Sequence, residues 1–129
     1  MINDVQEKDF QTRFNHWLKH YWTTTAKFEL KLTKKKSFPY SQLKEHQRDA
    51  LKNKKVIYKI PDLGAQNPFD CFVMVDVPGY VVIQFYIRGV NLFYVIEINK
   101  FEEYEKTSKR KSLTEEEANI ISDYSGRLA

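Results

Sequence analysis

Alternation between polar and apolar residues in the stretch Lys27–Thr33 is the pattern that most constrains the fold of this chain. Its apolar members are every second residue: Phe28, Leu30 and Leu32. Because successive side chains of a β-strand point to opposite faces, the pattern predicts a strand with one apolar and one polar face. Glu29 and Lys31 then lie two residues apart on the polar face. The stretch therefore predicts a carboxylate and an ammonium group that share one face of a strand.

A loop and a helix are predicted to follow this strand, with Ser41 as the N-cap of a helix that runs to about Asn53. Four residues recur there at helical spacing: Leu43, Gln47, Ala50 and Leu51. Gln47 is thus an amide within an apolar stripe, which predicts that it points toward the protein. We expect it to find hydrogen-bonding partners there.

The chain before the strand predicts a helix that packs on a sheet. Its apolar residues recur at three- and four-residue intervals: Phe10, Phe14, Trp17, Leu18 and Tyr21. Asn3 and Gln6 resemble a capping pair at its start. After the second helix, a strand over 56–60 is predicted to pair in parallel with strand 28–33 through a right-handed crossover. The ends of both strands would then meet at the sheet edge where such folds usually bind ligands.

The second half of the chain predicts three successive antiparallel strands. Residues 71–77 and 80–87 flank the turn pair Pro78-Gly79 and are predicted to form a hairpin, and residues 88–91 turn the chain into a strand over 92–98. Their near-continuous apolar character indicates a sheet covered on both faces.

A short helix over 99–105, a basic linker over 106–112 and a final helix are predicted toward the end of the chain. Thr114 and Glu117 have the form of a capping box for that helix. Its inner side is predicted to carry three apolar residues: Ala118, Ile120 and Ile121. The tail from Ser125 is predicted to be loose.

The composition is that of one globular domain over residues 1–129, long enough to bury a core. A single cysteine, Cys71, excludes an intramolecular disulfide and a cysteine metal site, and it favours an intracellular setting. No apolar run approaches the roughly 20 residues that span a bilayer, and the start lacks a signal-peptide pattern. We therefore expect a cytoplasmic protein without a membrane segment.

Basic residues are clustered, although the net charge is only +4. The clusters are at residues 34–36, 52–55 and 106–111. Such clusters attract polyanions, but an ordinary solvated surface explains them equally well.

The carboxylate and lysine of the strand could serve phosphodiester hydrolysis, although alternating charges also line solvated faces. A carboxylate can hold a divalent cation that lowers the pKa of a bound water, while an adjacent lysine positions this water. A Mg²⁺ ion normally takes one or two carboxylates together with waters and substrate oxygens. Glu29 would thus be accompanied by a second acid.

Three motifs follow one another at short spacing: Phe28-Glu29-Leu30-Lys31-Leu32-Thr33, Lys36-Ser37-Phe38-Pro39 and His46-Gln47. They resemble the strand, loop and helix of PD-(D/E)XK nucleases, specifically the Holliday-junction resolvases of archaeal and Gram-positive bacterial type. Residues 58–62 and 67–72 resemble phage-type resolvase-like proteins of the same superfamily.

The resemblance implies an α/β, restriction-endonuclease-like fold, in which helices flank a mixed central sheet. It also implies a Mg²⁺-dependent endonuclease, with Mn²⁺ as a substitute, that cuts branched DNA as a homodimer in recombination. If the chain is encoded by a phage, the compartment is the host cytoplasm.

In this family the Glu-x-Lys strand supplies a metal ligand and a lysine, which are Glu29 and Lys31 here, and the helix carries a glutamine, here Gln47. The family also places a metal-binding Asp on a preceding strand. This Asp is missing, because residues 22–26 contain no acid and leave no room for a hairpin.

Asp70 is the first candidate for the missing acid. It precedes a strand whose hairpin partner could lie beside residues 28–33, which would restore the site in a permuted order. Asp62 is the second candidate and Glu7 the third, since some family members use a glutamate on the first helix. Asp62 and Asp70 also fit plain turn or cap roles beside proline and glycine.

Gln84 lies where a normally ordered family member would have its Glu, fourteen residues after Asp70 (84 minus 70). Tyr86 stands at the position of the lysine, so the second strand pair is at best an incomplete copy of the motif.

The rim of the predicted site carries residues suited to DNA contact: Lys34, Lys35, Lys36 and His46. In the leading hypothesis Glu29 and Asp70 bind the metal, Lys31 orients the attacking water and Gln47 holds the geometry. The absent upstream Asp motivates an alternative, a catalytically inactive nuclease-fold module that binds nucleic acid or a protein partner.

Overall fold

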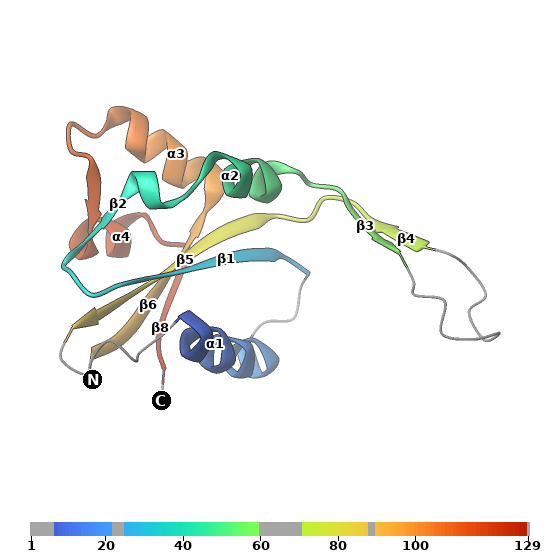
Figure 1. The fold of residues 1–129 in the computed structure, drawn as a ribbon, viewed down its shortest axis with the longest axis horizontal. Coiled ribbons are helices and arrows are strands. Elements are labelled where there is room, and N and C mark those ends of the chain that lie inside the picture. Colours follow the sequence, from blue (N-terminus) through green and yellow to red (C-terminus); the bar gives the residue numbers. More distant parts are fainter. Residues whose placement is uncertain (1–6, 22–24, 60–70, 88–89, 129) are drawn as a thin grey trace.

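The computed structural model describes residues 7–21, 25–59, 71–87 and 90–128. The elements follow in the order α1 (Glu7–Tyr21), β1 (Lys27–Thr33), β2 (Ser37–Pro39), the 3₁₀ turn η2 (Tyr40–Gln42), α2 (Glu45–Lys52), β3 (Val56–Lys59), β4 (Cys71–Met74), β5 (Gly79–Ile87), β6 (Val90–Glu97), α3 (Ile98–Thr107), β7 (Ser112–Thr114), α4 (Glu115–Ile121) and β8 (Tyr124–Arg127). Figure 1 shows a central sheet between helices and a two-stranded ribbon, β3 and β4, that projects from it.

The central sheet has the strand order β1-β5-β6-β8. β1 runs parallel to β5, whereas β6 is antiparallel to both β5 and β8, so the sheet is mixed. This confirms the predicted class at its coarse level, a mixed sheet flanked by helices. β1 lies at one end of this order, with Glu29 opposite Val81 and Lys31 opposite Ile83.

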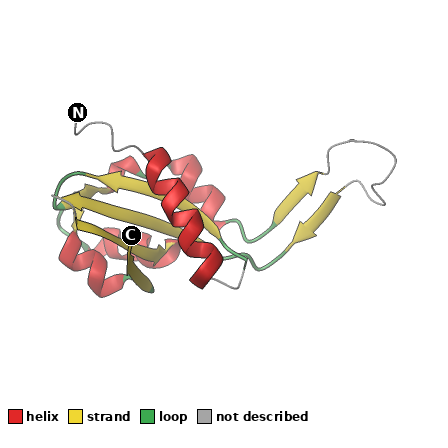
Figure 2. Ribbon diagram, turned by 90° about the horizontal axis from the view of Figure 1, so that it is seen from below, coloured by secondary structure: helices red, strands yellow, loops and turns green. Residues whose placement is uncertain are grey.

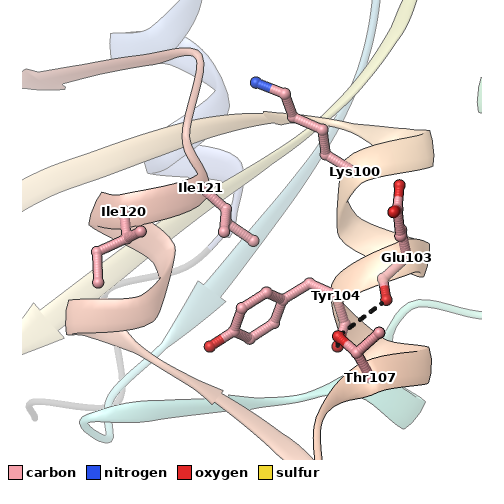
Figure 3. Close-up of a pocket in the computed structure, with 6 residues that line it drawn as sticks. All are labelled: Lys100, Glu103, Tyr104, Thr107, Ile120 and Ile121. Atoms are coloured by element: carbon pink, nitrogen blue, oxygen red, sulfur yellow. Dashed lines mark hydrogen bonds between the residues drawn. The ribbon is translucent and has the colours of Figure 1, made fainter.

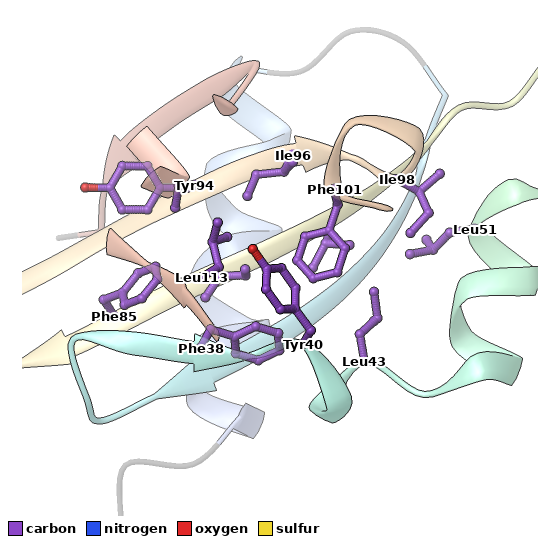
Figure 4. Packing of buried hydrophobic residues seen from close by; sticks show 13 residues of the cluster. Phe38, Tyr40, Leu43, Leu51, Phe85, Tyr94, Ile96, Ile98, Phe101 and Leu113 are labelled. Carbon is purple, nitrogen blue, oxygen red and sulfur yellow. The ribbon is translucent and has the colours of Figure 1, made fainter. Parts of the chain in front are cut away.

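Both faces of the sheet are buried, as the apolar strands predicted. On one face, α1 lies across the sheet (Figure 2), and its Phe10 and Phe14 pack against Val82 and Phe93. On the other face, a larger cluster joins the sheet to α2, α3, α4 and the β2–β7 pair (Figure 4). Its members include Phe38, Tyr40, Leu43, Leu51, Ile83, Ile98, Phe101 and Leu113.

The alternation of β1 separates its side chains as predicted. Phe28 and Leu30 pack against the α1 cluster. Glu29 and Lys31 point to the opposite face, where α2 lies. The predicted first helix is confirmed as α1. The predicted capping box of α4 is also confirmed, because the Thr114 side chain accepts a hydrogen bond from the Glu117 amide.

The predicted start of the second helix is wrong. α2 begins at Glu45, with Lys44 as its N-cap, and Ser41 lies in η2. Pro39 directs the chain into this 3₁₀ turn, whose Leu43 amide donates to the Tyr40 carbonyl and delays the helix. As a result Leu43 is buried ahead of the helix, and Ala50 is exposed.

Two predicted strand pairings are wrong. β3 pairs with β4 and not with β1, and β4 forms no hairpin with β5. The physical reason is burial, because residues 81–85 of β5 are all buried and suit the position between β1 and β6. Gly79 begins β5 where a Cβ atom would lie 2.1 Å from the Leu51 carbonyl oxygen, so its glycine serves close packing on α2.

The prediction of a loose tail is also wrong. Residues 124–127 form β8 on β6, and Leu128 is buried.

Ile120, predicted on the inner side of α4, is exposed. Ser112, the last residue of the predicted linker over 106–112, begins β7, which pairs with β2. None of the described helices has the length and apolar character needed to cross a membrane.

Candidate functional site

Glu29 and Lys31 form an ion pair on the face of β1 that α2 covers. The Lys31 Nζ atom is 3.7 Å from Oε2 of Glu29. The Lys31 side chain is only 13% exposed, whereas that of Glu29 is 31% exposed. The ammonium group is therefore held near the interior, and the carboxylate remains accessible from solvent.

Gln47 reaches the same carboxylate from α2. Its Nε2 atom donates to Oε2 of Glu29 at 3.4 Å, and its Oε1 atom accepts the Lys44 amide at 2.9 Å. The second bond satisfies an amide at the start of α2 and fixes which end of the side chain faces Glu29. The structure thus brings together three of the predicted site residues, Glu29, Lys31 and Gln47. The Gln47 amide was expected to need hydrogen-bonding partners, and it finds them in Glu29 and Lys44.

Arg48 anchors α2 beside this cluster. Its guanidinium donates to the carbonyls of Tyr40 and Leu43 at 2.8 and 2.9 Å and to the carboxylates of Glu105 and Glu102 at 2.5 and 3.4 Å. The group also lies 5.6 Å from the centre of the Phe101 ring. Because Arg48 follows Gln47 directly, these contacts hold the amide in place.

The charges around this anchor affect one another. Burial alone would raise the pKa of Glu102, but the hydrogen bonds and charges of Lys52 and Arg48 outweigh it and lower the pKa.

At the other end of α2, the Lys27 ammonium donates to the carbonyls of Ala50 and Asn53. Burial lowers the pKa of Lys27.

The predicted DNA-contact residues are all exposed. Lys34, Lys35 and Lys36 occupy the turn between β1 and β2, and His46 lies on the outer side of α2. Thr33 shapes this turn, because its hydroxyl donates to the Ser37 carbonyl and accepts the Lys35 amide.

The second acid is not brought to Glu29 by the predicted route. Asp62 and Asp70 lie outside the described residues. β5, the predicted hairpin partner of the strand after Asp70, does lie beside β1, but that strand, β4, pairs with β3 and forms no hairpin with β5. Glu7 is the first residue of α1, the helix that covers the face opposite to Glu29.

Gln84 is not part of the site, because its side chain lies on the other face of the sheet from Glu29. It lies opposite Leu32 in the β1–β5 register, on the α1 side of the sheet, and is buried. Its Nε2 atom donates to Oδ1 of Asn91 at 3.3 Å. The incomplete second copy of the motif therefore has a structural role.

Of the acids predicted for the metal, the described residues place only Glu29 at this site. Among the described residues, no group of three or more histidine, cysteine, aspartate or glutamate side chains could hold a metal. Gln47 and Lys31 both contact Oε2 of Glu29, and no described residue forms a hydrogen bond or ion pair with Oε1. One carboxylate with an accessible oxygen meets the lower limit for Mg²⁺, which takes one or two carboxylates with waters and phosphate oxygens.

Comparison with known proteins does not assign a family. No protein-family model matches this chain, and no curated protein matches it closely enough to count as a relative.

Sequence reasoning missed Lys44 and Arg48, which hold Gln47 and α2 in place. For Lys44 the sequence carried only half of the usual signal, because Gln47 supplies the reciprocal acceptor of a capping box but lysine has no side-chain acceptor.

Proposed function

We propose that this protein is a divalent-metal-dependent endonuclease of the PD-(D/E)XK type that acts on branched DNA. The observation that carries the proposal is the convergence of Glu29, Lys31 and Gln47 from two separate elements. Its support from sequence is the resemblance of the same residues to the resolvase motifs. A solvated strand face has no need of a largely buried lysine and a helix amide around one carboxylate.

Glu29 would hold the metal ion through Oε1, together with phosphate oxygens of the substrate. The ion, when bound, supplies a water of lowered pKa and neutralises charge at the phosphorus. Lys31 would orient this water and stabilise the charge on the phosphate oxygens. Gln47 positions the Glu29 carboxylate, since its amide donates to Oε2. Asp70, and after it Asp62, remain the candidates for a second ligand.

The basic turn would contact the DNA backbone. Lys34, Lys35 and Lys36 directly follow the strand that carries Glu29, and all three are exposed. Contacts of this kind bind phosphates without reading sequence. His46, exposed on α2 beside Gln47, would extend the same surface.

The deciding experiment is cleavage of a four-way DNA junction with Mg²⁺ or Mn²⁺, and with a linear duplex of the same arms for comparison. We expect the wild type to cut the junction and Glu29→Gln and Lys31→Ala to lose about 100-fold or more of the rate. Glu116→Gln, at an exposed glutamate on α4, is the matched control and should cut normally. A wild type that cuts nothing, or a Glu29→Gln variant that cuts equally well, would refute the mechanism.

The alternative is a module of the same fold that binds nucleic acid or a protein partner without cutting. The observation that favours it is that the described residues place none of the other predicted acids beside Glu29. It predicts junction affinity that falls steeply with salt and is the same with Mg²⁺ or EDTA. The nuclease proposal instead predicts tighter binding with a non-catalytic ion such as Ca²⁺, and loss of this gain in Glu29→Gln.

A further inference from the structure

β1 forms one end of the described sheet, so only one of its two edges is paired. Its neighbour in the strand order is β5, and Figure 1 shows β1 between α1 on one side and α2 on the other. The pairing with β5 runs without interruption from Lys27 opposite Gly79 to Thr33 opposite Phe85. β1 is thus a regular strand of seven residues, and no described strand covers its second edge.

One backbone hydrogen bond determines which residues of β1 face the open edge. The Lys27 amide donates to the Pro78 carbonyl at 2.9 Å, so Lys27 turns its backbone groups toward β5. In a parallel pair, alternate residues of a strand bond to the same neighbour, and the residues between them point their N–H and C=O groups the other way. Leu30 and Leu32 therefore present their amides and carbonyls to the open edge, where no described element bonds to them.

Backbone donors and acceptors at strand spacing suit one kind of ligand, which is another extended chain. β1 contains no proline or bulge that would prevent such addition. Its two lysines are held toward α2 and not over the edge. The Lys27 ammonium donates to the carbonyls of Ala50 and Asn53, and the Lys31 Nζ atom is 3.7 Å from Oε2 of Glu29. The open edge is therefore accessible to a further strand.

The side chains of β1 determine which sequence fits beside it. On the α2 side, Lys27, Glu29 and Lys31 alternate in charge. On the α1 side, Phe28 and Leu30 pack against the α1 cluster but are only partly buried, so a neighbouring strand can cover more of their apolar surface. Opposite charges directly across two strands stabilise their pairing, whereas like charges destabilise it. The best match is a strand with acidic, basic and acidic residues on one side and apolar residues between them.

The groove between α3 and α4 is less selective. Figure 3 shows Tyr104, Ile120 and Ile121 around it, and its lining also includes Lys100 and Glu103. An apolar groove that carries both signs of charge fits many segments equally well. The edge of β1, in contrast, determines both the backbone conformation of its ligand and the order of the ligand's charges.

We propose that the open edge of β1 binds an extended segment of a partner protein, in which apolar residues alternate with acidic, basic and acidic residues in that order. The segment adds to the sheet as a strand and bonds to the backbone of Leu30 and Leu32. Its acidic residues face Lys27 and Lys31, and its basic residue faces Glu29. This inference concerns partner binding and does not depend on nuclease activity.

The probe is the synthetic peptide Thr-Val-Glu-Val-Lys-Val-Glu-Val-Thr, whose pattern is the same in both directions and thus tests both strand orientations. Fluorescence anisotropy should show saturable binding to the wild type, and hydrogen exchange of the Leu30 and Leu32 amides should slow by about tenfold or more at saturation. The peptide with lysine and glutamate exchanged should bind about tenfold more weakly, because its charges then face like charges. No binding at millimolar peptide, equal binding of both peptides, or amides already protected in the free protein would overturn the proposal.

Leu30→Pro and Leu30→Ala separate the backbone contact from side-chain packing. Both remove the leucine side chain, but only proline removes the amide that faces the open edge, a position where edge strands tolerate proline. We expect Leu30→Ala to keep most of the peptide binding and Leu30→Pro to lose about tenfold or more.

Modified peptides keep the test decisive if Leu30→Pro does not fold. One peptide is N-methylated at its valines and the other at its charged residues. Because alternate amides of a strand face opposite edges, only one of these sets faces β1. One peptide should therefore bind the wild type normally and the other about tenfold or more weakly. Equal binding of the two would count against strand addition.

Discussion

Replacement of Arg48 by methionine is the most direct test of how α2 is held beside the site. The guanidinium joins α2 to two other parts of the chain: the carbonyls of Tyr40 and Leu43 at η2, and the carboxylates of Glu102 and Glu105 on α3. Methionine has a similar length and keeps much of the packing on Phe101, so the change removes mainly the charge and the hydrogen bonds.

The expected loss in the free energy of unfolding is about 3 kcal/mol. A hydrogen bond to a charged group contributes about 1.5 to 3 kcal/mol, and the Arg48 side chain is only 15% exposed. Solvent screens the hydrogen bond to Glu105, because the Glu105 side chain is 33% exposed. The expected loss is therefore well below the sum of four full hydrogen bonds to a charged group. For a chain of this length the loss corresponds to a fall in Tm of about 10 °C.

Urea unfolding of Arg48→Met, Glu105→Gln and the double variant gives the coupling energy between the two side chains. We expect about 1 kcal/mol or more of coupling. Arg48→Lys should recover part of the loss, because an ammonium keeps the charge but cannot reach both carbonyls and both carboxylates. Arg13→Met, an exposed arginine on α1, is the control. A loss below about 0.5 kcal/mol for Arg48→Met would refute the anchoring role.

Two further predictions concern packing and pH. Gly79→Ala should destabilise the fold by about 2 kcal/mol or more in urea unfolding, because its Cβ would meet the Leu51 backbone at 2.1 Å. A variant of normal stability would contradict this close approach. Burial and then the hydrogen bond to Glu115 raise the pKa of Tyr94 to about 12, so the stability that neutral Tyr94 provides is complete below about pH 10 and is lost as the pH rises toward 12. Between these pH values the wild type should lose about 2 to 3 kcal/mol more than Tyr94→Phe, whereas parallel losses would show that Tyr94 ionises freely.

Local patterns predicted the elements well because each depends on neighbouring residues. Alternation in Lys27–Thr33 gave both β1 and its two faces. The spacing of apolar residues gave α1, and the pair Thr114 and Glu117 gave the start of α4. In each case the signal and the structure it specifies lie within a few residues of one another.

Strand pairing was not predictable in the same way. β3 and β5 both follow α2 and are both apolar, so either could have been the parallel neighbour of β1. The choice depends on which strand fills the space between β1 and β6, which is a property of the whole core. Residues 124–127 show the same limit, because Tyr-Ser-Gly-Arg has no strand pattern and pairs only because β6 has an open edge.

The same distinction explains why part of the site converged and part did not. Glu29 and Lys31 share a face by alternation alone, and Gln47 turns toward them because its carbonyl oxygen caps the Lys44 amide. These are short-range rules, and they act within one strand–turn–helix unit. The second acid was instead assigned through a hairpin between β4 and a strand beside β1, which is a long-range arrangement. β5 does lie beside β1, but β4 pairs with β3, so the predicted route from Asp70 to Glu29 is not formed, whereas the short-range unit around Glu29 is.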